Sequence, residues 1–350
     1  MESRGSVFPL LADPATYRAC EHDLLADADG RAYWLDLFTS HIAVQVDHAE
    51  SAGLIDAAGG AKVIRALQAE IDEIRRQPDR QGGQLDILVL DAVRRTILYA
   101  AGIRDEFRQV KADENRRALT ELAARLHALD DLPSGEQAVN LVAGLVAGNL
   151  FDMGAKATAE VFASGASDAE RSFAASLARV PARPWCFDDV DRAAAWIDAP
   201  PGPVMIFLDN AGADVVLGAL PLARHLAKRG ADVRLVANRD PALNDVTAPE
   251  AERLLAAAAK IDAVFGAGRI TVIDGGNDAP LIDLLRVTPA CARAASDAGL
   301  LVLLGMGRAI ESNWTARFTV PVIRVAMLKD PQVAARVGGR MFGAVCRAEG

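Results

Sequence analysis

Five short apolar runs, each separated from the next by a stretch about one helix long, limit the folds open to the second half of this chain. The runs cover residues 204–209, 232–237, 269–274, 300–305 and 321–327. Continuous apolar strands that alternate with helices form mostly parallel sheets covered by helices on both faces. Ligands of such sheets bind at the carboxyl ends of the strands, so this half predicts an α/β fold with its site at that edge.

The first half of the chain has a different pattern. From about residue 15 to residue 180, apolar residues recur at three- and four-residue intervals, which is typical of amphipathic helices. The proline-rich segment 198–203 precedes the change to the second pattern. We therefore expect a mainly helical domain over residues 1–190 and an α/β domain over residues 191–350.

Charge and cysteine content argue against several classes of protein. A net charge of −9 over 350 residues disfavours a nucleic-acid or membrane-surface role, because both depend on basic patches. The four cysteines have no CxxC spacing, so they suggest neither a zinc site nor a disulfide framework. The sequence has no signal-peptide pattern and no run of about 18 apolar residues, so we expect a cytoplasmic protein.

Polar side chains follow the apolar runs, where a parallel sheet gathers its ligands. They are Asp209 and Asn210, the segments 237–247, 274–278 and 305–313, and Lys329. Hard divalent ions such as Mg²⁺ or Mn²⁺ take carboxylate, amide and water oxygens as ligands. Asp209, Asn210 and Asp245 supply such a set if the second run forms a strand beside the first.

Each of these features also has a purely structural interpretation. Asp209 and Asn210 are common helix N-cap types, and a helical stretch follows them. Asn244 and Asp245 are equally typical of a loop that leads into a helix. The glycine pairs after the third and fourth runs are typical of tight turns, and a lysine at a strand end is commonly solvated. The metal-site hypothesis therefore depends on the joint placement of these residues.

Several segments resemble the damage-control phosphatase family, in particular its plant members and the phosphatase domain of the vertebrate fourth pantothenate kinase. These segments are 8–14 (FPLLADP), 33–38 (YWLDLF), 148–157 (GNLFDMGAKA), 207–247 (from FLDNAGAD to NDVT), 276–287 (GNDAPLIDLLRV), 305–314 (GMGRAIESNW) and 331–346 (PQVAARVGGRMFGAVC). The resemblance implies a helical amino-terminal part packed on a three-layer α/β/α Rossmann-like part. It also implies a metal-dependent phosphomonoester hydrolase.

The resemblance assigns roles to individual residues. Asp209, Asn210 and Asp245 would bind a divalent ion, which could be Mn²⁺, Co²⁺, Ni²⁺ or Mg²⁺, and Asp209, Asp245 and Lys329 would be catalytic. The candidate substrate-binding residues in these motifs are Asn149, Asp152, Asn244, Gly307, Arg308 and Lys329. Arg308 has an alternative in a surface ion pair with Glu311, three residues further on.

The substrate is implied by the resemblance alone. It would be a small molecule, 4'-phosphopantetheine or its oxidised or otherwise damaged forms. A sugar-phosphate phosphatase of the same family is an alternative, and so is a non-catalytic homologue that binds metal or phosphate. The second alternative arises because relatives generally have a glutamate directly before GMGR, where this chain has Leu304. Glycines 266 and 268 precede a strand rather than follow one, which argues against a dinucleotide site.

The residues around Asp209 also bear on the mechanism. A covalent aspartyl-phosphate route of the haloacid-dehalogenase type needs a second acid two residues after the nucleophile, and that position is Ala211. We therefore expect direct attack by metal-bound water. The backbone N–H groups of residues 211–213, at the expected helix start, would add hydrogen-bond donors to the phosphate.

Overall fold

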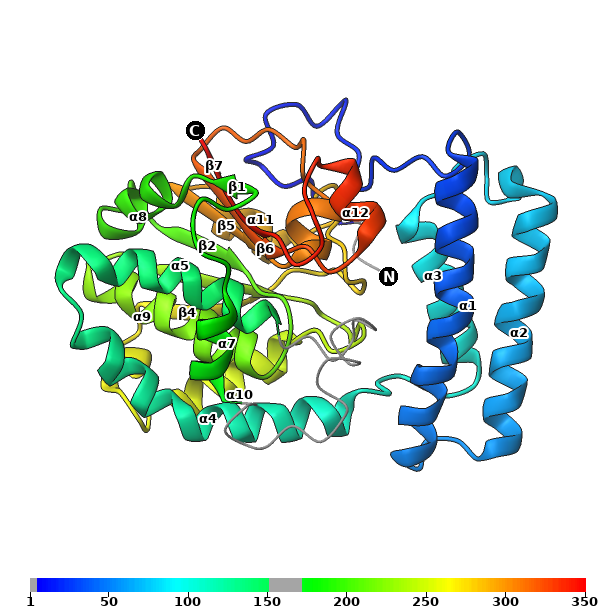
Figure 1. The fold of residues 1–350 in the computed structure, drawn as a ribbon, viewed down its shortest axis with the longest axis horizontal. Helices are drawn as coiled ribbons and strands as arrows, with labels where there is room; N and C mark the ends of the chain where they lie inside the picture. The colour runs from blue at the N-terminus through cyan, green and yellow to red at the C-terminus, as the bar shows by residue number, and fades with distance from the viewer. Residues whose placement is uncertain (1–4, 151–171) are drawn as a thin grey trace.

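A seven-stranded sheet forms the centre of the protein in a computed structural model, which describes residues 5–150 and 172–350 (Figure 1). Its strands are β1 (Phe187–Asp188), β2 (Val204–Phe207), β3 (Val233–Ala237), β4 (Ile270–Asp274), β5 (Leu300–Leu304), β6 (Val322–Met327) and β7 (Ala344–Glu349). The strand order is β1-β7-β6-β5-β2-β3-β4, and only the β6–β7 pair is antiparallel. The predicted α/β fold is confirmed, and all five apolar runs form strands.

Strands β1 and β7 were not predicted from the sequence. β1 has two residues, and β7 has three buried residues followed by the half-buried Arg347 and Glu349 on either side of Ala348, so neither forms a long continuous apolar run. Both lie at the β1 edge of the sheet, where β7 pairs antiparallel with β6 along six residues. An edge position requires less apolar sequence than a central one, and this explains the weak signal.

Alternate residues of each central strand face two different hydrophobic clusters. In β5, Leu300 and Val302 pack with one cluster, while Leu301 and Leu303 pack with the other. The first cluster includes residues of α4 (Arg108–Asp130), α5 (Ser134–Leu150), α7 (Phe173–Arg179), α8 (Val190–Asp198), α9 (Leu220–Lys228) and α10 (Ala248–Ala258). The second includes residues of α11 (Pro289–Ala295), α12 (Pro331–Arg336) and the amino-terminal segment 8–24. The sheet is thus the middle layer of three.

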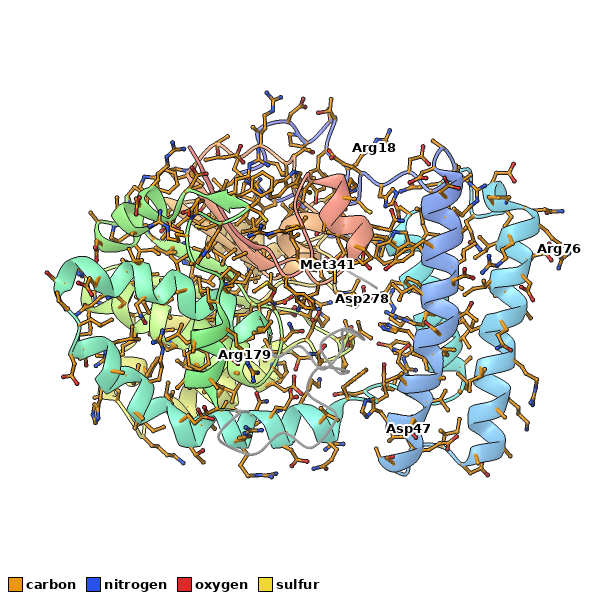
Figure 2. All side chains as sticks on the ribbon, viewed as in Figure 1. Arg18, Asp47, Arg76, Arg179, Asp278 and Met341 are labelled. Atoms are coloured by element: carbon orange, nitrogen blue, oxygen red, sulfur yellow. The ribbon has the colours of Figure 1, made fainter. Side chains whose placement is uncertain are left out.

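Helices α1 (Ala28–Ser51), α2 (Ala57–Arg76) and α3 (Ile87–Ala100) form a separate group at one side of the sheet (Figure 1). Each begins after an aspartate whose side chain accepts a hydrogen bond from a backbone N–H of the first turn, an effective N-cap. Their apolar faces join the second cluster, as Trp34, Ile42 and Leu67 do. Met341 lies between this group and the sheet (Figure 2).

Helix α5 packs closely on the segment that follows β2. A methyl group at Gly148 would come within 2.8 Å of the Cα atom of Asp214, so only glycine permits this approach. Asp214 begins η2 (Asp214–Ala219), a π-helical turn that leads into α9. Helices α4 and α5 therefore share a core with the strands, although they precede residue 190. The domain boundary expected near residue 190 stays a prediction.

The structure also bears on membrane association. Across residues 5–150 and 172–350, no helix is both long and apolar enough to cross a membrane.

Candidate active site

Backbone pairing joins the loops that follow β2 and β3. Asn210 and Asp245 form an isolated antiparallel bridge, and the N–H group of Val246 donates to the carbonyl of Asp209 at 3.0 Å. The N–H group of Ala211 donates to the carbonyl of Asn244 at 2.9 Å. Because β2 and β3 are parallel neighbours, their carboxyl ends meet at one edge, and the oxygen donors predicted from the sequence lie together there.

Arg308 lies between the two carboxylates of this group. Its Nη1 donates to Asp209 Oδ1 and its Nη2 donates to Asp245 Oδ2, the latter at 2.8 Å. The guanidinium is buried, which opposes its charge, but the two carboxylates outweigh burial and raise its pKa. The alternative of a surface ion pair with Glu311 is therefore wrong. Two acidic side chains from neighbouring strands converge on one buried cation.

The donor set is suited to a divalent ion. Among the described residues, no group of three or more His, Cys, Asp or Glu side chains could hold a metal, so an ion here would be held by two carboxylates and an amide. Oxygen ligands of this kind are those that Mg²⁺ and Mn²⁺ prefer. Arg308 contacts Asp209 through Nη1 and Asp245 through Nη2, so the two carboxylates converge on one positively charged group. The residues present therefore fit the predicted metal.

Asn149 of helix α5 holds the carboxyl groups of Asp209 and Asp214 in place. Its Nδ2 donates to Asp209 Oδ2 at 2.8 Å and to Asp214 Oδ2 at 3.1 Å. Its Oδ1 accepts from the N–H of Met327, at the end of β6, and its backbone carbonyl accepts from Lys329 Nζ at 3.0 Å. Asn149, predicted to bind substrate, is thus buried behind the acidic group and links it to Lys329.

Two features near Asp209 were not predicted. Asp214 is buried beside Asp209, and burial together with the charge of Asp209 raises the pKa of Asp214 to about 7. Gly305 directly follows β5 and has a φ of +86°, and a methyl group there would overlap the carboxyl group of Asp209 at 2.0 Å. The glycine that follows Leu304 is therefore required by both conformation and space.

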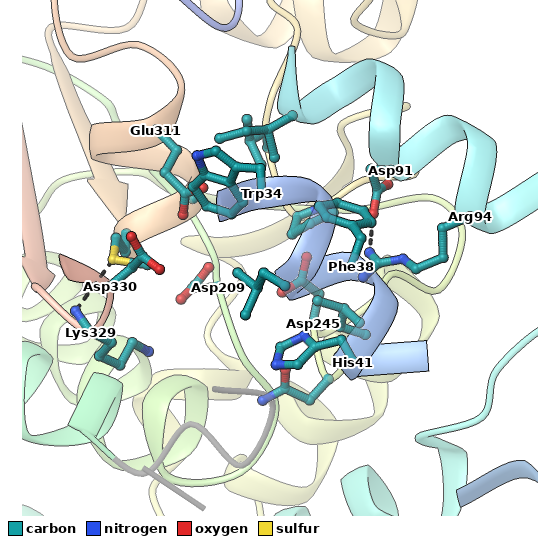
Figure 3. Close-up of a pocket in the computed structure, with 18 of the residues that line it drawn as sticks. Trp34, Phe38, His41, Asp91, Arg94, Asp209, Asp245, Glu311, Lys329 and Asp330 are labelled. Carbon is teal, nitrogen blue, oxygen red and sulfur yellow. Dashed lines mark hydrogen bonds and ion pairs between the residues drawn. The ribbon is translucent and has the colours of Figure 1, made fainter. Parts of the chain in front are cut away.

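A cavity of about 330 Å³ opens between this edge of the sheet and helices α1 and α3. Asp209, Asn210, Asn244, Asp245, Gly307 and Lys329 line it from the sheet side. Tyr33, Trp34, Leu37, Phe38 and His41 line it from α1, and Ile87, Asp91 and Arg94 from α3. Figure 3 shows Lys329, Asp330 and Glu311 on one side of Asp209, with Asp245 and His41 on the other. The site thus combines a charged floor with an aromatic and apolar wall.

Polar contacts fix the wall against the floor. The hydroxyl of Tyr33 donates to Asp330 Oδ2 at 2.5 Å, and Asp330 Oδ1 accepts from the first N–H groups of α12. Arg94 pairs with Asp91 on α3, and Arg95 pairs with Asp278 at 2.7 Å in the loop beyond β4. These contacts attach α1 and α3 to the edge of the sheet at two separate points.

Leu304, where the family resemblance implies a glutamate, does not line the cavity. It is 2% exposed and packs in the cluster that contains α5, on the face of the sheet away from α1. Its neighbours in sequence, Met306 and Gly307, do line the cavity. The replacement therefore changes the core behind the site rather than its accessible wall.

Two expectations about the segment after β2 are wrong. Asp209 and Asn210 do not cap a helix, because η2 begins at Asp214 after Ala213 and has no side-chain cap. Of the three N–H groups expected to donate to a phosphate, those of Ala211 and Gly212 do not face a ligand, because they donate to the Asn244 carbonyl and to Asn115 Oδ1 at 2.7 Å. The helix expected directly after Asn210 starts several residues later, which leaves the Asp-Asn pair on a loop.

The other residues predicted for the site lie in different places. Asn244, Gly307 and Lys329 line the cavity, while Arg308 binds the two carboxylates beneath it, and the substrate-binding roles of these four residues stay predictions. Asp152 lies outside the described residues. The sequence did not indicate the wall residues of α1, although the segment YWLDLF was singled out. Its three- and four-residue spacing marks one face of a helix, but no local pattern shows which surface that face meets.

Comparison with known proteins assigns the family. Residues 40–345 match the model of the damage-control phosphatase ARMT1-like domain. A damage-control phosphatase of Arabidopsis thaliana is 35% identical, over 99% of this chain and 98% of its own length. Pantothenate kinase 2 of Arabidopsis thaliana is 34% identical over 98% of this chain, and a mouse 4'-phosphopantetheine phosphatase is 31% identical over 97% of it. This chain spans 42% and 48% of the lengths of these two larger proteins.

A solved structure has the same fold. A DUF89 family protein from Pyrococcus horikoshii superposes with a TM-score of 0.65, over 89% of this chain and 96% of that one, at 16% identity. The family model, the full-length plant relative and the arrangement of acidic side chains at the sheet edge agree with one another. The chain therefore belongs to the ARMT1-like damage-control phosphatase family and is a phosphatase, one of a family that generally depends on divalent metal ions and acts on small phosphate-bearing molecules.

Proposed function

We propose that this phosphatase hydrolyses 4'-phosphopantetheine or its oxidised or damaged forms. The observation that carries the proposal is the cavity itself, with two converging carboxylates and a lysine on its floor and an apolar wall from α1 above them. A phosphate group fits the charged floor, and a long uncharged tail fits the wall. The name of the mouse relative, which is similar over nearly the whole of this chain, supports the same substrate.

The side chains of the floor have separate roles in this proposal. A divalent ion held by Asp209, Asn210 and Asp245 would neutralise phosphoryl charge and acidify water. Lys329, whose Nζ is held by the carbonyl of Asn149 at 3.0 Å, binds a non-bridging phosphoryl oxygen. Asn149 keeps Asp209 oriented through its 2.8 Å hydrogen bond. Phosphoryl transfer needs little more than positioning and charge compensation, which these groups supply.

The apolar wall favours this substrate over a sugar phosphate. Trp34, Leu37 and Phe38 present carbon surface to the cavity, while a sugar requires several hydrogen-bond partners for its hydroxyl groups. Burial of polar hydroxyls against such a wall costs free energy when they are not paired. The pantetheine tail has methyl, methylene and thiol groups that bury favourably there.

A substrate panel tests the proposal. The purified protein is freed of metal with a chelator, reconstituted in turn with Mn²⁺, Co²⁺, Ni²⁺ and Mg²⁺, and assayed for phosphate release from 4'-phosphopantetheine, its S-sulfonate and several hexose phosphates. We expect kcat/KM for the pantetheine esters to exceed that for the sugar phosphates at least tenfold, equivalent to about 1.4 kcal/mol. Faster hydrolysis of a hexose phosphate would support the sugar-phosphate alternative. An absence of turnover with every metal and substrate would support a non-catalytic role.

Replacement of one acidic side chain tests the assignment of the floor. Asp245→Asn removes a charged oxygen donor while keeping the size of the side chain, so we expect kcat/KM to fall at least a hundredfold. Asp113→Asn on the exposed surface of α4 is the control, and its activity should equal that of the wild type. Circular dichroism and thermal melting verify that both variants fold. An Asp245→Asn protein with wild-type turnover contradicts the assignment.

A further inference from the structure

Glu311 is a buried acid in the cavity that the roles above do not use. It ends the π-helical turn η4 (Gly307–Glu311) after β5, and only 8% of its surface is exposed. Its side chain lines the same cavity as Asp209 and Lys329. Figure 3 shows its carboxyl group beside Trp34 and Asp330, on the Lys329 side of Asp209. The acid is therefore placed where a bound phosphate ester would lie.

Glu311 differs from the other acids of the cavity in having no bonded partner. Asp330 accepts from Tyr33, Asp91 pairs with Arg94, and Asp209 binds Arg308. Among residues 5–150 and 172–350, no side chain forms a hydrogen bond or ion pair with the Glu311 carboxyl group. A buried carboxylate without a partner is costly, so a neutral, protonated carboxyl group is favoured at this position.

The surroundings of Glu311 favour the protonated form. Burial is the largest cause that raises its pKa, and the negative charge of Asp330 adds to it. Arg336 of α12 and Lys329 oppose this effect, and Asp209 reinforces it, with the result that the pKa is raised to about 8. Tyr33, which faces the same group from α1, stays neutral because burial raises its pKa also. At neutral pH the cavity therefore contains one uncharged carboxylic acid with a proton to donate.

An alkyl phosphate needs such a proton. When the bond between phosphorus and the bridging oxygen breaks, its electron pair stays on that oxygen, and an alkoxide is a poor leaving group in the absence of an acid. We propose that Glu311 is the general acid that protonates the leaving oxygen of the substrate. Water forms the new bond to phosphorus and releases its proton to solvent, the products are alcohol and inorganic phosphate, and Glu311 recovers its proton from solvent. This inference rests on the proposed hydrolysis of alkyl phosphomonoesters.

Leaving-group dependence tests the role of Glu311. Glu311→Gln keeps the shape of the side chain but has no acidic proton, and it is assayed as the metal-loaded enzyme with 4'-phosphopantetheine and with p-nitrophenyl phosphate. General acids contribute about 10²- to 10⁴-fold, so we expect a loss of this size for the alkyl ester. The nitrophenolate leaves without protonation, so its rate should fall less than tenfold. The matched control is Glu106→Gln, a buried acid with a raised pKa that lies outside the cavity and accepts from Gln45.

The outcomes separate this inference from the proposed function. Equal losses for both substrates, or no loss for either, would overturn the role of Glu311 while leaving the phosphatase assignment intact. A wild-type enzyme that hydrolyses neither substrate would instead overturn the proposed function. A second measurement is the pH profile, in which wild-type kcat for the alkyl ester should decline as pH rises through about 8. That decline should be absent in Glu311→Gln, and a profile shared by both enzymes contradicts the proposal.

Discussion

At the scale of single residues, Arg308 supplies the positive charge between two buried carboxylates. It binds Asp209 and Asp245 from below the cavity, where both acids are buried. Removal of one partner from a buried ionic group leaves the other charges uncompensated, at a cost of about 3–5 kcal/mol. In this protein the uncompensated charges would be the two acids that are predicted to bind a metal.

The variant Arg308→Met removes this positive charge. We expect the metal-free variant to be about 3–5 kcal/mol less stable than the wild type, because two buried carboxylates then face each other. Addition of Mn²⁺ should restore more stability to the variant, since the ion no longer competes with a guanidinium. Differential scanning calorimetry with and without Mn²⁺ measures both effects. Arg116→Met, which removes an exposed ion pair on α4, is the control. If Mn²⁺ stabilised Arg308→Met and the wild type equally, the prediction would be contradicted.

The raised pKa of Glu311 should make the stability of the protein depend on pH. Its pKa is raised from 4.5 to about 8 in the folded protein, so between these values the folded state binds a proton that the unfolded state has lost. The contribution of Glu311 to the free energy of unfolding is therefore fully present below pH 4.5, and it is lost as pH rises through 8. We expect Glu311→Gln to gain stability relative to the wild type between pH 5 and pH 8, as measured by urea unfolding. A stability difference that is constant with pH would show that Glu311 is ionised when folded.

At the scale of elements, helix α5 positions the carboxyl groups of Asp209 and Asp214. Gly148 lets α5 approach η2, and the next residue, Asn149, then reaches Asp209 and Asp214. One small residue in α5 thus determines how a helix before the sheet contacts the loop after β2. The same close contact explains why α5 belongs to the sheet core although it lies in the predominantly helical first half of the chain.

Because Asn149 of α5 donates to Asp209 and Asp214, the role of this helix can be tested with two of its glycines. Gly148→Ala places a methyl group 2.8 Å from the Asp214 Cα, so we expect about 1–3 kcal/mol of destabilisation and a tenfold to hundredfold loss of kcat/KM as Asn149 shifts. Gly135→Ala in the first turn of the same helix meets no atom within 4 Å and should be neutral or stabilising by up to about 1 kcal/mol. Equal effects at the two positions in thermal melts and assays would argue against this role of α5.

The strands and the acidic group could be predicted from sequence for related physical reasons. Runs such as 204–209 are continuous and apolar because both faces of a central strand are buried, so they stand out from their surroundings. Asp209 and Asp245 could then be brought together, because parallel strands end at one edge. The position of Asp214 could not be predicted, because the π-helical turn after Ala213 changes which residues point back toward Asp209.

At the scale of the whole molecule, the cavity depends on contacts between segments that are far apart in sequence. Tyr33 and Asp330 are separated by 297 residues, yet their hydrogen bond attaches α1 to the edge of the sheet. No local pattern encodes such a contact, which is why the sequence predicted the charged floor but not the apolar wall. In the proposed complex, two parts of the cavity contact different parts of the substrate. The sheet edge carries the groups that act on phosphate, and α1 supplies the surface that contacts the rest of the substrate.

This division predicts that wall variants change substrate preference but not the chemistry. Leu37 is half-buried and lines the cavity from α1, so Leu37→Ala removes apolar surface that would contact the pantetheine tail. Loss of about 1–2 kcal/mol of burial should raise KM for 4'-phosphopantetheine about fivefold to thirtyfold, with little change in kcat. Both constants for p-nitrophenyl phosphate, which has no such tail, should stay near the wild-type values.

Leu54→Ala is the control for this test, because Leu54 lies in the connection between α1 and α2, is 43% exposed and does not line the cavity. It should leave KM unchanged for both substrates, which would show that truncation of a leucine in this group has no general effect. If Leu37→Ala lowered kcat for both esters and left KM alone, α1 would act on the geometry of the floor. The Tyr33–Asp330 hydrogen bond is the contact through which such an effect would reach Lys329, the neighbour of Asp330 in sequence. The ratio of the two KM changes therefore measures whether the wall binds substrate or only supports the floor.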